Sequence, residues 1–142
     1  MENKRQFYFA FGRTALKIGL SSLRLNENDK ILIPDYICDV VSHPIHSLGL
    51  KIVYYPIKDN LTPYWDKIKT IINTIPVRAL MIVNYFGQPQ DWKQYYKLKN
   101  NYNIYLIDEE RVQQYEPANI GSFSGNSNAY LVPREKVPAN LL

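Results

Sequence analysis

The fold is decided by residues 79–96, which read ALMIVNYFGQPQDWKQYY. The apolar run at 79–83 is far shorter than the roughly 20 residues of a membrane span, and it is typical of a strand covered on both faces. A turn follows at 87–89, and aromatic residues then recur at helical spacing over 92–96. A buried strand that leads through a turn into a helix is a building unit of α/β proteins.

The same alternation extends to both sides of this unit. Apolar spacing predicts further elements at 13–25 (helix), 31–33 (strand), 41–48 (helix), 51–57 (strand), 64–75 (helix) and 103–108 (strand). Four strands, each preceded by a helix, indicate parallel strands joined by right-handed crossovers. We therefore expect an α/β fold, a three-layer sandwich in which helices cover both faces of a mainly parallel sheet.

Prolines and small residues are expected to mark the ends of these elements. Thr62 is expected to cap the helix that precedes the central strand, with Pro63 in its first turn. Gly49 is expected to close the helix before it, in which Pro44 should remove one hydrogen bond and kink the axis. Pro56 indicates either the end of a strand or the edge of the sheet.

The regular pattern ends near residue 110. Residues 111–142 contain glycines, serines and asparagines without a sustained period, and only Phe123 and 130–132 indicate a short strand. We therefore expect an α/β domain at 1–110, followed by an irregular C-terminal segment at 111–142.

Composition narrows the classes of partner. The net charge is +4, but the 17 lysines and arginines are spread along the chain, which is typical of a solvated surface rather than a nucleic-acid interface. The apolar run at 7–11 is too short for a signal peptide. Cys38 is the only cysteine, so an intrachain disulfide and a multi-cysteine zinc site are excluded. We expect a cytoplasmic protein with neither a membrane nor a nucleic acid as partner.

Candidate site residues lie where the strands end. Ligands of an open parallel sheet bind outside the carboxyl ends of its strands, which here carry 34–36, 84–87 and 108–109. The helix start at Gly12-Arg13-Thr14 adds a glycine and a hydroxyl, which suit a phosphate group but also fit an ordinary helix cap. Asp39, His43 and His46 share a helix face, but Pro44 disturbs their geometry, and we expect no metal.

Five segments in order carry a resemblance to a known family. They are 12–16 (GRTAL), 29–36 (DKILIPDY), 49–53 (GLKIV), 84–91 (NYFGQPQD) and 107–109 (IDE). Together they resemble the first half of the large domain of the DegT/DnrJ/StrS aminotransferases, over roughly residues 10 to 110. Those enzymes have the fold-type-I architecture and use pyridoxal phosphate, mostly to aminate keto sugars. The resemblance implies a partial large domain of that type.

The resemblance implies a set of cofactor-binding residues. Gly12, Arg13 and Thr14 match the Gly-Thr turn that holds the cofactor phosphate, and Arg13 replaces a small residue there, so that it either adds charge or blocks the site. Cys38 stands where many members place the ring that stacks on the pyridine, with a small buried core residue as the alternative. Asn84 belongs to the fourth matching motif, residues 84–91.

The acid pair of the family falls on Asp108 and Glu109. Its aspartate keeps the pyridine nitrogen protonated, and this aspartate corresponds by position to Glu109 and by residue type to Asp108. Two solvated carboxylates at a strand end are the alternative.

The resemblance also implies a missing nucleophile. Family members bind the cofactor covalently through a lysine that follows a Ser-Phe segment, whereas here 122–124 (SFS) is followed by Lys136 in a context that does not match. No residue is therefore assigned a catalytic role.

We expect a truncated or degenerate aminotransferase-like protein, ancestrally acting on a nucleotide-linked keto sugar and inactive alone. The alternatives are a non-catalytic binding or assembly module, and one half of a split enzyme whose lysine comes from a second polypeptide. A homo-oligomer, or a partner chain that covers the sheet edge, is expected.

Overall fold

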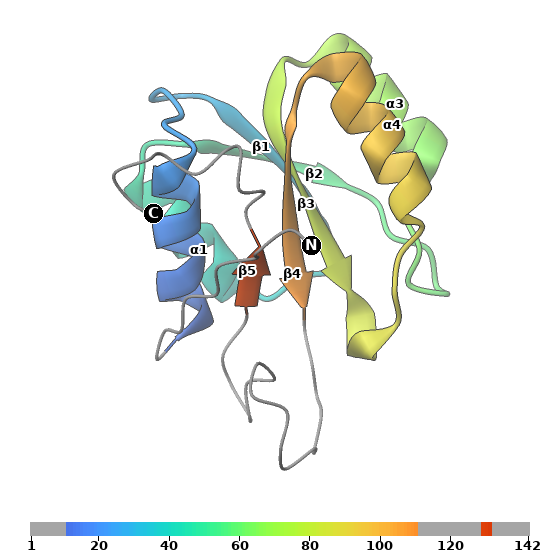
Figure 1. The fold of residues 1–142 in the computed structure, drawn as a ribbon, viewed down its shortest axis with the longest axis horizontal. Coiled ribbons are helices and arrows are strands. Elements are labelled where there is room, and N and C mark those ends of the chain that lie inside the picture. Colours follow the sequence, from blue (N-terminus) through green and yellow to red (C-terminus); the bar gives the residue numbers. More distant parts are fainter. Residues whose placement is uncertain (1–10, 111–128, 132–142) are drawn as a thin grey trace, which may run out of the picture.

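The computed structural model describes residues 11–110 and 129–131, which form a five-stranded sheet between two layers of helices (Figure 1). The strand order is β2-β1-β3-β4-β5, with β1 to β4 parallel and β5 antiparallel to β4. The strands are β1 (Lys30–Pro34), β2 (Lys51–Tyr55), β3 (Val77–Asn84), β4 (Tyr105–Glu110) and β5 (Ala129–Leu131).

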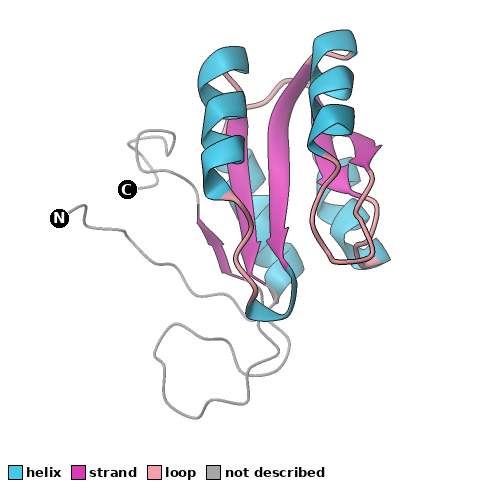
Figure 2. Ribbon diagram, turned by 90° about the vertical axis from the view of Figure 1, so that its right-hand side faces the viewer, coloured by secondary structure: helices cyan, strands magenta, loops and turns pink. Residues whose placement is uncertain are grey.

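Helices cover both faces of this sheet, as Figure 2 shows from the side. The α-helices are α1 (Gly12–Ser22), α2 (Ser42–Ser47), α3 (Trp65–Thr74) and α4 (Trp92–Tyr102), and two short 3-10 helices are η1 (Asp39–Val41) and η2 (Tyr85–Gly87). The side chains of α1 and α2 pack on one face, and those of α3 and α4 pack on the other. The expected α/β three-layer sandwich is confirmed.

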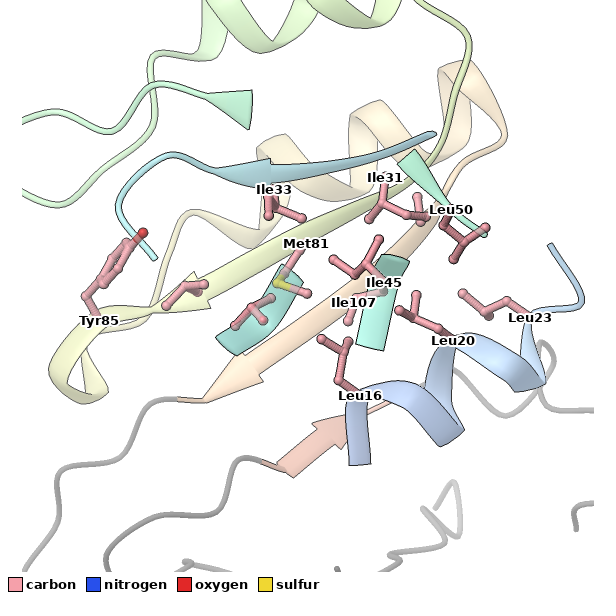
Figure 3. Packing of buried hydrophobic residues seen from close by; sticks show 13 residues of the cluster. Leu16, Leu20, Leu23, Ile31, Ile33, Ile45, Leu50, Met81, Tyr85 and Ile107 are labelled. Carbon is pink, nitrogen blue, oxygen red and sulfur yellow. The ribbon is translucent and has the colours of Figure 1, made fainter. Parts of the chain in front are cut away.

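Each face has its own hydrophobic core. The first core, drawn in Figure 3, joins α1, η1 and α2 to the sheet through Leu16, Leu20, Ile31, Ile33, Val41, Ile45, Met81 and Ile107. The second core joins α3 and α4 to the sheet through Leu32, Tyr55, Ile68, Leu80, Ile82, Tyr95, Leu98 and Leu106. Successive residues of β1 alternate between the two cores, which explains why its sequence is an unbroken apolar run.

The direction of winding reverses between β1 and β3. The connection from β1 to β2 runs through η1 and α2 on the side of the first core, whereas those from β2 to β3 and from β3 to β4 run through α3 and α4 on the other side. In open sheets of this kind the crevice at the carboxyl ends of such a strand pair is the usual ligand position.

Two predictions about helix ends are wrong. Pro44 does not kink a helix, because η1 precedes α2 and Pro44 falls in the first turn of α2, where its missing N–H has no intrahelical acceptor. Thr62 does not cap α3, whose N-cap is Tyr64, and its hydroxyl donates instead to Asn60 Oδ1 at 2.6 Å.

Other boundaries differ by a few residues for local reasons. α1 ends at Ser22 rather than at 25, and the backbone of Arg24 then turns into the left-handed region with a φ of 51°. β4 begins two residues later than expected, because Asn103 ends α4 in a left-handed conformation. Gly49 closes α2 as expected, with a φ of 72° and its N–H bonded to His46 O at 2.9 Å.

The C-terminal segment is described only where it joins the sheet. Tyr130 and Leu131 lie in β5, paired with β4, whereas Phe123 and Val132 lie outside the described residues. The division of the chain at residue 110 therefore stays a prediction. In the described ranges, every helix is too short or too polar to cross a bilayer.

Candidate functional site

The start of α1 lies at the carboxyl edge of the sheet. Residues 23–29 connect the end of α1 to the start of β1, so the first turn of α1 lies toward the carboxyl ends of the strands, on the side of β5 (Figure 1). Leu16, one turn into the helix, packs with Ile107 of β4 in the first core (Figure 3). The apolar face of α1 therefore brings residues 12–14 to the same edge as the ends of the strands.

The first turn of α1 has backbone donors without an intrahelical acceptor. The N–H groups of Thr14 and Ala15 both donate to Phe11 O at 3.1 Å. The N–H groups of Gly12 and Arg13 come before the first of these hydrogen bonds and have no acceptor within the helix. Among the described residues no side chain caps the helix at Phe11, and its first turn holds no acid. The positive end of the helix dipole lies at this turn and suits an anion.

Arg13 and Thr14 are both exposed at this turn. The guanidinium of Arg13 lies over the ring of Phe11, with 4.6 Å between the guanidinium carbon and the ring centroid. This cation–π contact keeps a positive charge beside the helix start. A positive charge is thus found beside the N–H groups of Gly12 and Arg13, which have no intrahelical acceptor.

Cys38 follows β1 and precedes η1, which contacts α1. Its thiol is exposed, so the alternative that Cys38 is a small core residue is wrong. The neighbouring Tyr36 has a ring that is 58% exposed and lies 5.5 Å from the ring of buried Tyr85. The Tyr85 hydroxyl donates to Tyr36 O at 2.6 Å, which ties the loop after β1 to the end of β3.

Asn84, the last residue of β3, is buried. Its Oδ1 accepts from the backbone N–H of Gln90 at 3.1 Å, so the side chain closes the turn between β3 and α4. Phe86, inside this turn, is exposed and has a φ of 52°, a left-handed backbone that is uncommon for an aromatic residue. Asn84 is therefore at the expected edge.

Asp108 and Glu109 lie near the carboxyl end of β4. In the parallel ladder Asp108 is opposite Ile82 and Glu109 is opposite Val83, so both positions lie near the level of Asn84. The backbone thus brings the expected acid pair to the edge that the start of α1 also reaches.

The seven residues expected at the site all lie along one edge of the sheet. Their roles in binding a cofactor stay predictions. Tyr85 and Gln90 connect the loops at this edge. Tyr85 lies in the expected site loop at 84–87, but the sequence assigned neither residue a role, because their partners Tyr36 and Leu61 are distant along the chain. Throughout 11–110 and 129–131, no three histidine, cysteine, aspartate or glutamate side chains are grouped to hold a metal, and this includes Asp39, His43 and His46.

Comparison with known proteins identifies one family. Residues 6–110 match the model of the DegT/DnrJ/EryC1/StrS aminotransferase family. No curated protein matches the sequence significantly.

Solved structures with the same fold include three that contain a cofactor or carry the family name. E. coli GDP-4-keto-6-deoxy-D-mannose-3-dehydratase with bound hydrated PLP gives a TM-score of 0.67 at 20% identity, over 87% of this chain and 34% of that one. NtdA from Bacillus subtilis with bound PMP gives 0.69 at 19% identity, over 88% and 32% of the two chains. A DegT DnrJ EryC1 StrS aminotransferase from Brucella abortus gives 0.67 at 12% identity, over 89% and 41%.

These likenesses show a shared fold. The present chain spans roughly a third of the length of those proteins, since it covers 32% to 41% of the three. It therefore corresponds to part of a fold-type-I large domain.

Proposed function

This chain belongs to the DegT/DnrJ/EryC1/StrS aminotransferase family, and we propose that it keeps the phosphate-binding part of that family's pyridoxal phosphate site without being an active aminotransferase alone. The observation that carries this proposal is the first turn of α1, which no described side chain caps and which lies toward the carboxyl ends of the strands, on the side of β5. The proposed cofactor-binding unit is the α/β part at residues 1–110.

The phosphate end of the cofactor fits the residues at this turn. The N–H groups of Gly12 and Arg13 and the hydroxyl of Thr14 would bind phosphate oxygens, and the Arg13 guanidinium would offset their charge. Bound pyridoxal phosphate would supply an electron-accepting ring, the chemistry on which transamination depends.

The ring end of the cofactor departs from the family's pattern. Cys38 is exposed where the resemblance places an aromatic ring, and a thiol offers less surface for stacking. Asp108 or Glu109 would hold the proton on the pyridine nitrogen. We propose that the cofactor binds weakly, because the phosphate contacts are kept while the ring contacts are reduced.

The substrate class proposed for the ancestral site is a nucleotide-linked keto sugar. The E. coli neighbour is a GDP-4-keto-6-deoxy-D-mannose dehydratase, and this supports the proposal by likeness of fold. We also propose that the chain acts in the cytoplasm.

Substitutions at the first turn of α1 test the phosphate site. Thr14→Val and Arg13→Ala should each raise the dissociation constant for pyridoxal phosphate about ten-fold or more, because each removes a contact to an anion worth about 1.5–3 kcal/mol. Isothermal titration calorimetry measures this constant. Lys17→Ala, which removes an exposed charge one turn further along the helix, is the matched control and should have a smaller effect.

Two outcomes of this titration change the interpretation. Tighter binding by Arg13→Ala would show that the arginine obstructs the turn. If neither substitution alters binding, or if the unmodified protein does not bind the cofactor, the turn is only a helix start. A non-catalytic binding or assembly module would then be the better interpretation of the chain's function.

The second half of the proposal, that the chain lacks the lysine needed for activity, is tested by chemical labelling of its lysines. Borohydride fixes any pyridoxal phosphate that is covalently attached to a lysine, and peptide mapping then locates the labelled residue. We expect substoichiometric label distributed over exposed lysines such as Lys17, Lys67 and Lys69. One label per chain at a single lysine would refute the absence of a nucleophile, whether at Lys136 or elsewhere.

We further propose that the chain self-associates or binds a partner chain. Apolar side chains are exposed at Phe11 before α1, at Ile18 on α1 and at Val40 on η1. Among the described strands, β2 has a neighbouring strand on one side only. Light scattering over a range of concentrations should show a mass above 16.6 kDa for one chain. A monomer that persists at high concentration would contradict self-association, and a partner chain would then be required.

A further inference from the structure

A proline interrupts the central strand pair of the sheet. Asp29 O and the Asp35 N–H both bond to β2, at 2.9 Å each, so the odd-numbered residues of β1 face β2 and the even-numbered residues face β3. Pro34 is therefore the next donor position toward β3, but proline has no N–H. Accordingly, the pairing of β1 with β3 ends at Leu32 and Leu80, while β1 stays paired with β2 up to Pro34.

Side chains supply the hydrogen bonds that β1 no longer gives. Met81 O accepts from the hydroxyl of Tyr55 at 2.7 Å, and Val83 O accepts from Gln90 Nε2 at 3.0 Å. Met81 and Val83 are two residues apart on one strand, so their carbonyls point to the same side. Both carbonyls lie on buried residues, where an unpaired acceptor would be costly.

The amide group of Gln90 has a second acceptor. Its Nε2 also donates to Leu61 O at 2.8 Å, so its two hydrogens are matched by two carbonyls. Leu61 is in the loop after β2 and has a φ of 65°, a left-handed conformation that persists only where the surroundings fix it. The backbone N–H of Gln90 donates to Asn84 Oδ1. One residue thus links the loop after β2, the end of β3 and a residue of the candidate site.

We propose that Gln90 is a positioning residue of the carboxyl edge, which supplies a donor to Val83 O beyond the end of the β1–β3 pairing and fixes Asn84 and the loop after β2 at the carboxyl ends of β1 and β3. Its effect on a bound cofactor rests on the proposed function, whereas its effect on the loop does not. Gln90 is half-buried and acts through Asn84 and Leu61.

Three variants separate hydrogen bonding from packing at this position. Gln90→Met keeps the length of the side chain but removes both donations, while Gln90→Lys keeps N–H donors of similar reach. Gln88→Met, at an exposed position in the same turn, is the matched control. The readout is hydrogen exchange at Lys58 and Leu61, whose N–H groups bond to Thr62 O and Lys58 O at 2.8 Å each.

We expect exchange at Lys58 and Leu61 to be about ten-fold faster or more in Gln90→Met, and close to the unmodified rate in Gln90→Lys and Gln88→Met. Exchange at Leu106 in β4 serves as the reference for global opening and should not change. Unchanged rates in Gln90→Met, or equally fast exchange in Gln90→Lys, would overturn the proposal.

A titration of the same variants with pyridoxal phosphate tests whether Gln90 affects cofactor binding. Gln90→Met should bind it several-fold more weakly than Gln88→Met does. Failure of the unmodified protein to bind would count against the proposed function alone, since the exchange rates still decide the role of Gln90. Equal affinities of the two methionine variants, with binding intact, would overturn the effect of Gln90 on the cofactor site.

Discussion

Leu16→Ala is expected to lower the free energy of unfolding by about 2–5 kcal/mol, the range for large-to-small substitutions in a packed core. Leu16 is only 1% exposed and packs among the residues that hold α1 on the sheet (Figure 3). The cavity would lie next to Ile107, beneath the turn that carries Gly12. Urea unfolding, followed by circular dichroism, measures the loss.

Ile18→Ala is the matched control for this substitution. Ile18 lies on the same helix but is 46% exposed, so its truncation should change stability by no more than about 0.5 kcal/mol. A loss at Leu16 no larger than that at Ile18 would contradict the packing of α1 on β4. Because α1 also carries residues 12–14, Leu16→Ala should weaken phosphate binding as well.

The second large effect concerns Tyr55, whose phenol is fully buried in the second core. Tyr55→Phe removes the donor to Met81 O and is expected to cost about 1–3 kcal/mol at neutral pH, because the carbonyl is left without that bond. Tyr54→Phe is the matched control, since Tyr54 is the preceding residue and is exposed. Denaturant unfolding at pH 7 compares the two variants. A smaller loss at Tyr55 than at Tyr54 would contradict the buried bond.

Tyr55 is also expected to lower the free energy of unfolding at alkaline pH. Burial, and secondarily the nearby Tyr95, raise the pKa of the Tyr55 phenol well above the ordinary tyrosine value. Above that ordinary value, about 10, the unfolded chain releases this proton while the folded chain keeps it, so the unfolded state binds fewer protons. The free energy of unfolding should therefore fall as pH rises, by up to about 1.4 kcal/mol per pH unit from this group.

Tyr55→Phe should remove this part of the alkaline slope, although it lowers stability at pH 7. Unfolding curves collected between pH 8 and pH 11 for both tyrosine variants measure the difference, with the pH range chosen about the ordinary tyrosine pKa of about 10. A slope in Tyr55→Phe as steep as in Tyr54→Phe would show that Tyr55 does not carry the effect.

The layers of the fold could be predicted from local pattern alone. The run at 31–33 is apolar at every position because alternate side chains enter different cores, and the spacing in α1 and α3 follows one buried face. The ends of helices were harder to predict. Thr62 has the residue type of a cap, but the loop after β2 uses its hydroxyl to bond Asn60.

Part of the candidate site could likewise be predicted from the sequence, and part could not. Its position at the strand ends follows from the parallel topology, so residues 12–14, Asn84 and 108–109 could be placed at one edge. The hydrogen bonds between loops could not be predicted, because Gln90 and its acceptor Leu61 are 29 positions apart in the sequence, and Tyr85 and its acceptor Tyr36 are 49 positions apart. Such bonds leave no periodic signal in the sequence, and the left-handed backbone at Leu61 and at Phe86 lies at or next to the bonded residues.

The sheet also partitions the molecule. Ile31 and Ile33 belong to the core under α1, while Leu32 between them belongs to the core under α3 and α4. Adjacent positions of β1 therefore pack against different neighbours, so a substitution at Leu32 would alter the packing around residues such as Ile68 and not around Ile33. A substitution in the core under α3 and α4 can therefore leave unchanged the packing of the core that holds α1, and with it residues 12–14, on the sheet.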